Sequence, residues 1–100
     1  MEEGTPVIGL LTIEIHCPHS HSLKDKRMTV KAIKDRLRKR FNVAVAETGY
    51  QELWQRSVLS AVTVSSGRSG LETMMEAMAR DVEERYSDEL NIGTEVELIG

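Results

Sequence analysis

The order in which the hydrophobic repeat changes along this chain constrains its fold more than any other feature. In Val7–His16 the side chains alternate, and both faces of the segment carry apolar residues, as in a strand at the centre of a sheet. Apolar residues then recur at helical spacing over residues 23–40. Two further strand-like segments follow at 42–49 and at Ser57–Val64. The chain to this point therefore predicts a strand, a helix and two strands.

The remainder of the chain predicts a second helix and a last strand. Leucine, methionine and valine form an apolar stripe over residues 70–87, and residues 92–99 alternate again. The pairs Ser22–Asp25 and Ser69–Glu72 have the spacing of capping boxes, which mark helix starts. Right-handed crossovers arrange the order β-α-β-β-α-β as a four-stranded antiparallel sheet with both helices on one face. We therefore expect an α+β chain with a ferredoxin-like fold.

Length and composition favour one small domain. One hundred residues suffice for a single core, and we expect residues 7–100 to form it, with the acidic residues 1–6 as a disordered lead-in. The single cysteine excludes an internal disulfide and fits a reducing compartment. No apolar run is long enough to span a bilayer. We therefore expect a cytoplasmic protein with no membrane partner.

The only cysteine and the three histidines form one short cluster: His16, Cys17, His19 and His21. A tetrahedral metal site normally takes ligands from two separate segments, and no second segment carries Cys or His. We expect a turn without a metal, with an incidental site at His19, His21 and a carboxylate as the alternative. Cys17 has no oriented base to activate it. Because no carboxylate pair, triad or phosphate-binding glycine loop is present either, we expect neither an enzyme nor a cofactor-binding protein.

Basic residues are concentrated in the first predicted helix, although the formal net charge of the chain is -3. Between Lys24 and Arg40 lie nine of the thirteen basic residues, against two acids. Five of them share one helical flank: Lys24, Arg27, Lys31, Lys34 and Arg38. A row of this kind is about 20 Å long and can follow several phosphates of a nucleic acid. An ordinary solvated face, partly neutralised by the acidic second helix, is the alternative interpretation.

The aromatic residues restrict how RNA would be bound. Phe41, Tyr50, Trp54 and Tyr86 all fall outside the two predicted central strands. Stacking of bases on the sheet is therefore not supported, and recognition of the backbone of structured RNA fits better. Trp54 itself has two interpretations, a lid over one end of the core or an anchor for a protein partner.

Apolar residues on the other face of the sheet raise a second possibility. Ile8 and Leu10 are expected on the face away from the helices, where they would be exposed in a monomer. An edge strand also offers unpaired backbone groups to another chain. Self-association through the sheet face or an edge strand is therefore the alternative function.

Three segments of the sequence resemble the bacterial YlxP-like family of small proteins. They are Ser20–Arg27, Arg40–Glu47 and Leu53–Arg56, and the similarity runs from about Ile8 to the end of the chain. The resemblance implies a ferredoxin-like fold and genes beside those of transcription-termination, translation-initiation and ribosome-maturation factors. Since the family has no established activity, the resemblance implies only that the following residues serve such work: Lys24, Lys26, Arg27, Trp54, Gln55 and Arg56.

We therefore expect a non-enzymatic accessory factor of ribosome assembly or translation, with ribosomal RNA or the small ribosomal subunit as its partner. The expected contacts to RNA backbone are Lys24, Lys26, Arg27, Lys31, Lys34 and Arg38. The expected partner-binding residues are Trp54, Gln55 and Arg56. The alternative is a protein-interaction module that forms a homodimer through its sheet face or an edge strand.

Overall fold

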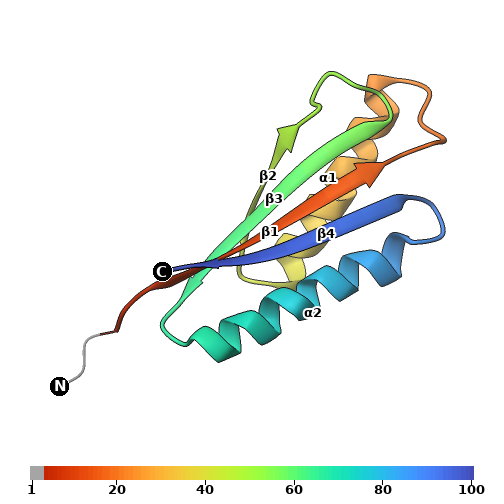
Figure 1. Ribbon diagram of the computed structural model, residues 1–100. Helices are drawn as coiled ribbons and strands as arrows, with labels where there is room; N and C mark the ends of the chain where they lie inside the picture. Colours follow the sequence, from red (N-terminus) through yellow and green to blue (C-terminus); the bar gives the residue numbers. More distant parts are fainter. Residues whose placement is uncertain (1–3) are drawn as a thin grey trace.

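The computed structural model describes residues 4–100 and confirms the predicted order of elements (Figure 1). The elements are β1 (Val7–His16), α1 (Leu23–Arg40), β2 (Ala44–Gly49), β3 (Arg56–Ser65), α2 (Arg68–Tyr86) and β4 (Asn91–Ile99). Of the predicted lead-in, residues 1–3 lie outside the described residues, and residues 4–6 belong to no helix or strand.

The four strands form one antiparallel sheet in the order β2-β3-β1-β4. β1 pairs with β3 on one side and with β4 on the other, which confirms that it is central. Together with the two helices, this topology is the ferredoxin-like fold that the sequence predicts. Neither α1 nor α2, the helices of residues 4–100, combines the length and the apolar character needed to cross a membrane.

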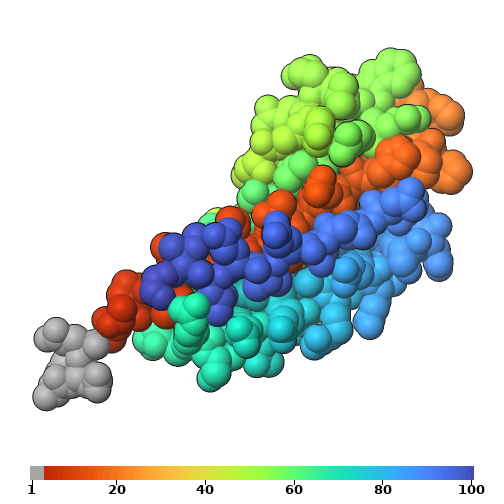
Figure 2. Space-filling model, viewed as in Figure 1, coloured from red at the N-terminus to blue at the C-terminus, as the bar shows by residue number. Residues whose placement is uncertain are grey.

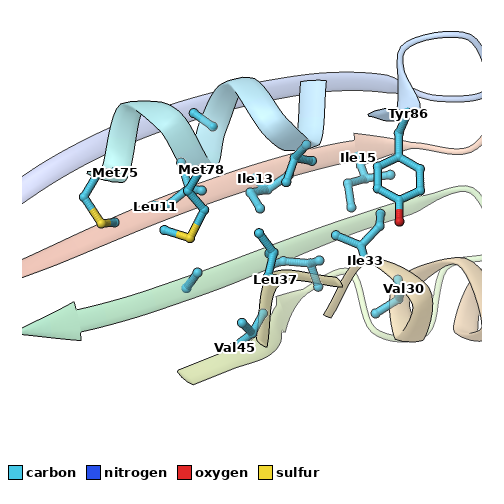
Figure 3. Close-up of a cluster of buried hydrophobic side chains, with 14 of the residues drawn as sticks. Leu11, Ile13, Ile15, Val30, Ile33, Leu37, Val45, Met75, Met78 and Tyr86 are labelled. Carbon is cyan, nitrogen blue, oxygen red and sulfur yellow. The ribbon is translucent and has the colours of Figure 1, made fainter. Parts of the chain in front are cut away.

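The core lies between the two helices and one face of the sheet (Figure 3). The alternate residues Leu11, Ile13 and Ile15 of β1 point into it and are essentially inaccessible to solvent. They meet side chains from both helices, namely Val30, Ile33, Leu37, Met75, Met78 and Tyr86. The period-two and period-3.6 patterns of the sequence therefore identify the buried faces, since only those faces remove apolar surface from water.

Gly9 occupies a place on the buried face of β1 where a side chain would not fit. A Cβ atom there would lie 2.8 Å from the Sδ atom of Met75 and 3.2 Å from Cδ1 of Leu71. Its lack of a side chain therefore allows α2 to approach the central strand closely.

The start of α1 follows the predicted capping box. The Ser22 side chain accepts a hydrogen bond from the backbone N–H of Asp25 (3.0 Å), and the Asp25 carboxylate accepts one from the backbone N–H of His21 (3.0 Å). These bonds satisfy N–H groups that a helix start leaves without intrahelical partners.

The predicted capping box at the start of α2 is wrong. This helix begins at Arg68 with Gly67 as its N-cap, so Ser69 already lies inside the first turn and caps nothing. The backbone carbonyl of Gly67 accepts from the N–H of Leu71, and the N–H of Gly67 donates to the Ser65 hydroxyl. Hydrogen bonds made by Ser65 and Gly67 thus fix the start of the helix two residues earlier than the serine–glutamate spacing indicates.

Candidate nucleic-acid interface

One flank of α1 is neutralised by α2. The guanidinium of Arg36 makes two hydrogen bonds of 2.9 Å to the Asp81 carboxylate, and Arg40 Nε lies 3.2 Å from Oδ1 of the same residue. The hydrogen bond to Asp81 raises the pKa of Arg36 above its ordinary value. These two arginines join the helices, and Asp81 balances their charge.

The opposite flank of α1 carries the predicted basic row, which we call the cationic flank: Lys24, Arg27, Lys31, Lys34 and Arg38. Within residues 4–100, Lys24, Arg27 and Lys34 form no ion pair. Lys34 is half-buried and the other four members are exposed. The row therefore lies on the side of the helix that Asp81 does not reach.

Two members of the cationic flank share one carboxylate of their own helix. Lys31 Nζ lies 2.7 Å from Asp35 Oδ2, and Arg38 Nη1 lies 3.8 Å from Oδ1. The hydrogen bond from Lys31 lowers the pKa of Asp35. Exposed pairs of this kind contribute little to stability, so a phosphate can replace the carboxylate at small cost.

Lys26, expected among the RNA contacts, is completely buried. Its ammonium donates to the carbonyls of Tyr50 (2.7 Å), Gln51 (3.1 Å) and Arg56 (3.2 Å). It also pairs with the Glu47 carboxylate at 2.9 Å. The prediction for Lys26 is therefore wrong, because an ammonium with no exposed surface cannot meet a phosphate.

The sequence contained a signal for this burial. Lys26 precedes Val30 by four positions, and Val30, Ile33 and Leu37 continue the same stripe. A lysine on the apolar face of a helix must either extend its ammonium to solvent or find polar partners inside. Here it finds them, and the Ser57 hydroxyl, 2.6 Å from Glu47 Oε2, completes the buried group.

The segment between β2 and β3 is folded around the Lys26 ammonium. We call this segment, together with Arg56 at the start of β3, the recognition loop (residues 50–56). Besides the three carbonyls held by Lys26, the carbonyl of Gln55 accepts from the backbone N–H of Cys17 at 2.7 Å. Tyr50 has a left-handed backbone (φ 56°), which costs about 1–3 kcal/mol in a residue other than glycine. The Lys26 contacts maintain this conformation.

The three predicted partner-binding residues of the loop have different roles. The Gln55 amide donates to the carbonyls of Pro18 (3.4 Å) and Ser20 (3.3 Å), so it serves the loop's own structure. The guanidinium of Arg56 lies over the Tyr50 ring, 4.2 Å from its centroid. The Trp54 side chain is 55% exposed, so the interpretation of Trp54 as a lid over the core is wrong.

A shallow hollow of about 460 Å³ lies beside Trp54. Its lining comes from the recognition loop and the end of β1: His16, Glu52, Leu53, Trp54, Gln55 and Arg56. Figure 2 shows the loop at the upper end of the molecule, next to the orange segment that leads into α1. The hollow therefore lies at the same end of the molecule as the first residues of the cationic flank.

The histidine and cysteine cluster forms the turn between β1 and α1. Cys17 is 2% exposed, and this burial raises the pKa of its thiol, which disfavours the nucleophilic thiolate. His16 Nδ1 lies 3.3 Å from the Asn91 amide, while His19 and His21 are exposed. Within residues 4–100 no group of three or more His, Cys, Asp or Glu side chains is placed to hold a metal.

The sheet face away from the helices carries an apolar patch at one end. Its most exposed members are Ile8, Val62, Val64 and Ile99. Ile8 pairs in register with both Val64 and Ile99, so these side chains are direct neighbours. The expectation that Ile8 is exposed is confirmed, whereas Leu10 is half-buried.

The free edge of β2 is partly occupied by side chains. Arg38 Nη2 donates to the carbonyl of Val45 at 2.9 Å, and the Gln51 amide donates to the carbonyl of Glu47 at 2.9 Å. These carbonyls belong to alternate residues of the strand. Another strand that approached this edge would have to compete with both bonds, which disfavours edge pairing there.

Comparisons with known proteins give a family and confirm the fold. Residues 8–93 match the model of a family described as "Protein of unknown function (DUF503)". The chain is 40% identical to "Uncharacterized protein YlxP" of Bacillus subtilis (strain 168) over 62 residues, which are 62% of this chain and 67% of that protein. A solved structure, "De novo designed protein Foldit4", is similar with a TM-score of 0.58 and 15% identity, covering 96% of this chain and 98% of the other.

The three sequence segments that resemble the family meet at the buried lysine. Lys26 comes from the first segment, its partner Glu47 from the second, and the carbonyl of Arg56 from the third. The Lys26 ammonium and the bond from the Gln55 amide to the Ser20 carbonyl tie the first segment to the recognition loop. In this structure the three segments therefore hold a short loop that carries the exposed Trp54.

Proposed function

We propose that this chain, which belongs to the DUF503 family, is a non-enzymatic RNA-binding factor that places its cationic flank on the phosphate backbone of structured RNA. We propose ribosomal RNA or the small ribosomal subunit as the target, because the family resemblance implies genes beside translation and ribosome-maturation factors. Of the residues expected from the sequence, Lys26 is removed from the proposed contacts and the other five remain.

A single observation supports the proposal most strongly. The acidic residue that α2 offers to α1, Asp81, pairs with Arg36 and Arg40 on one flank only. A surface that served only to balance α2 would have its charges on that flank. Instead, five cations form a row on the other flank, where only Asp35 pairs with them among residues 4–100. Such a row attracts a polyanion and releases its counterions on binding.

The test is the salt dependence of binding to a ribosomal RNA fragment. With five phosphate contacts, we expect the slope of log K against log salt concentration to be about -4. The double variant Lys24→Ala/Arg27→Ala removes two unpaired cations and should reduce the slope by about 2. Co-sedimentation with small ribosomal subunits then tests the target, and the same variant should be lost from the particle fraction.

A matched control lies on the other helix. Arg80 and Arg85 of α2 are exposed and form no ion pair within residues 4–100, so Arg80→Ala/Arg85→Ala removes the same charge from another surface. This variant should keep the slope of the wild type. Equal effects of the two double variants would mean that only net charge matters and would contradict the proposed docking of α1.

Self-association is the second candidate function, favoured by the apolar patch of Ile8, Val62, Val64 and Ile99. Burial of this patch against a second copy would remove apolar surface from water. The proposed route is the sheet face rather than the edge of β2, whose carbonyls at Val45 and Glu47 already accept side-chain hydrogen bonds. Sedimentation over a concentration series tests this candidate, and Val64→Lys should shift any dimer to monomer.

A further inference from the structure

The recognition loop presents apolar side chains to solvent from a backbone that hydrogen bonds hold at both ends. Tyr50, Leu53 and Trp54 are 42%, 46% and 55% exposed. A buried ammonium and the Cys17 N–H hold the backbone carbonyls at both ends of the loop, those of Tyr50, Gln51, Gln55 and Arg56. A preorganised site of this kind loses little conformational entropy when a ligand binds, which is a property of binding surfaces.

The hollow beside Trp54 has the chemistry of a nucleotide site. Trp54 offers an exposed aromatic ring, and Leu53 adds apolar surface beside it. The carboxylate of Glu52 and the imidazole of His16 supply hydrogen-bonding groups along the lining. Arg56, whose guanidinium lies over Tyr50 and 3.9 Å from Glu14 Oε1, supplies a positive charge that is about half exposed. A base needs an aromatic surface and hydrogen-bonding partners for its edge, while its phosphate needs a cation. The volume of about 460 Å³ lies within the range of small-ligand sites.

The position of the hollow favours RNA over a peptide. Lys26 connects the first turns of α1 directly to the recognition loop, so Lys24 and Arg27 lie near the same end of the molecule as Trp54. A single strand that leaves this end of a duplex bound along α1 would therefore emerge at the end of the molecule that carries the loop. Aromatic residues beside a cationic track are the combination by which proteins bind unpaired nucleotides.

We propose that the hollow lined by His16, Glu52 and Trp54 binds an unpaired nucleotide of the RNA, with its base stacked on the Trp54 indole. The inference rests on the proposed RNA binding and adds a preference for RNA in which a single strand adjoins a duplex. It places stacking on a loop, whereas RNA-binding proteins of this fold commonly stack bases on the strands of the sheet.

The experiment uses the full chain and two RNAs, a blunt duplex and the same duplex with a short single-stranded adenosine overhang. Trp54 is the only tryptophan, so its fluorescence reports directly on stacking. The overhang should increase affinity by about 5- to 150-fold and should quench the emission, whereas the blunt duplex should bind without quenching. Trp54→Ala should abolish the gain from the overhang without weakening binding of the blunt duplex, and Trp54→Phe should keep most of the gain.

Each failure has a distinct pattern. If the two RNAs bind the wild type equally and without quenching, or if Trp54→Ala keeps the gain, the nucleotide site is refuted while RNA binding by α1 stands. If neither RNA binds, the proposed function fails and the inference fails with it. If Trp54→Ala weakens binding to intact small ribosomal subunits but not to the overhang RNA, the loop binds protein and the inference is overturned. Because Trp54 lies outside the core, its variants should fold, which far-UV circular dichroism checks.

Discussion

Replacing Lys26 by methionine should cost a large part of the stability of the domain. Methionine retains the unbranched apolar stem of the lysine side chain, so the change removes the ammonium with little change in packing volume. Lost with it are the ion pair to Glu47 at 2.9 Å and three hydrogen bonds to the recognition loop. The Glu47 carboxylate, 16% exposed, would be left with the Ser57 hydroxyl as its one remaining side-chain partner within residues 4–100.

The magnitude follows from what remains after the substitution. Removing one partner of a buried ion pair costs about 3–5 kcal/mol, because the other charge stays buried and uncompensated. A domain of this size has a free energy of unfolding of about 5–15 kcal/mol. The expected decrease in Tm is therefore about 12–40 °C. The assay is urea unfolding followed by far-UV circular dichroism, since an exposed Trp54 reports poorly on the core.

Two further variants separate the buried charge from other causes. Lys24→Met lies two residues away on the exposed side of α1 and should change the free energy of unfolding by less than about 0.5 kcal/mol. Lys26→Met/Glu47→Leu removes both charges and should be more stable than the sum of the single changes by about 1–3 kcal/mol. A loss below about 1 kcal/mol for Lys26→Met, or strict additivity of the pair, would refute the reasoning.

Three other predictions concern the helices, the central strand and the thiol. Asp81→Asn weakens the charge-assisted bonds to Arg36 and Arg40 and should lower the free energy of unfolding by about 1–3 kcal/mol, with a smaller loss at high salt, as urea titrations would measure. Gly9→Ala places a Cβ 2.8 Å from Met75 Sδ and should cost about 1–3 kcal/mol by calorimetry, whereas Gly93→Ala, with no atom within 4 Å, should cost nothing measurable. Burial raises the pKa of the Cys17 thiol, so the neutral thiol contributes its full stability below its ordinary pKa of 9.0. As pH rises from there through the higher pKa of the folded state, this contribution to the free energy of unfolding should be lost. Urea titrations at successive pH values measure the loss, and Cys17→Ala should not show it.

The fold was predictable because its determinants are local. The alternation in Val7–His16 and the helical spacing of Val30, Ile33 and Leu37 reflect burial on one face, which a sequence displays directly. The start of α2 was not predictable from the spacing of Ser69 and Glu72. Hydrogen bonds made by Ser65 and Gly67 set it instead, and these depend on how the preceding strand ends.

The candidate site was predictable only in part, because burial of a charge depends on distant partners. The exposure of Lys24, Arg27, Lys31 and Arg38 follows from their position on one side of a helix whose other side is apolar. Lys26 is different. Its place on the apolar stripe of α1 is visible in the sequence, but its carbonyl partners lie 24 to 30 positions away and no local pattern indicates them. The exposure of Trp54 was not predictable for the same reason, because it depends on a loop conformation that the distant Lys26 maintains.

The side-chain bonds on β2 limit the size of any assembly built by adding strands. A sheet grows into a filament only when it can accept a new neighbour at both of its sides. In this fold one lateral side is β2, where Arg38 and Gln51 already hold two carbonyls, and the other is β4. A chain that can pair only through the edge of β4 can add one other copy to its sheet and no more. Assembly by strand pairing should therefore end at dimers, even at high protein concentration.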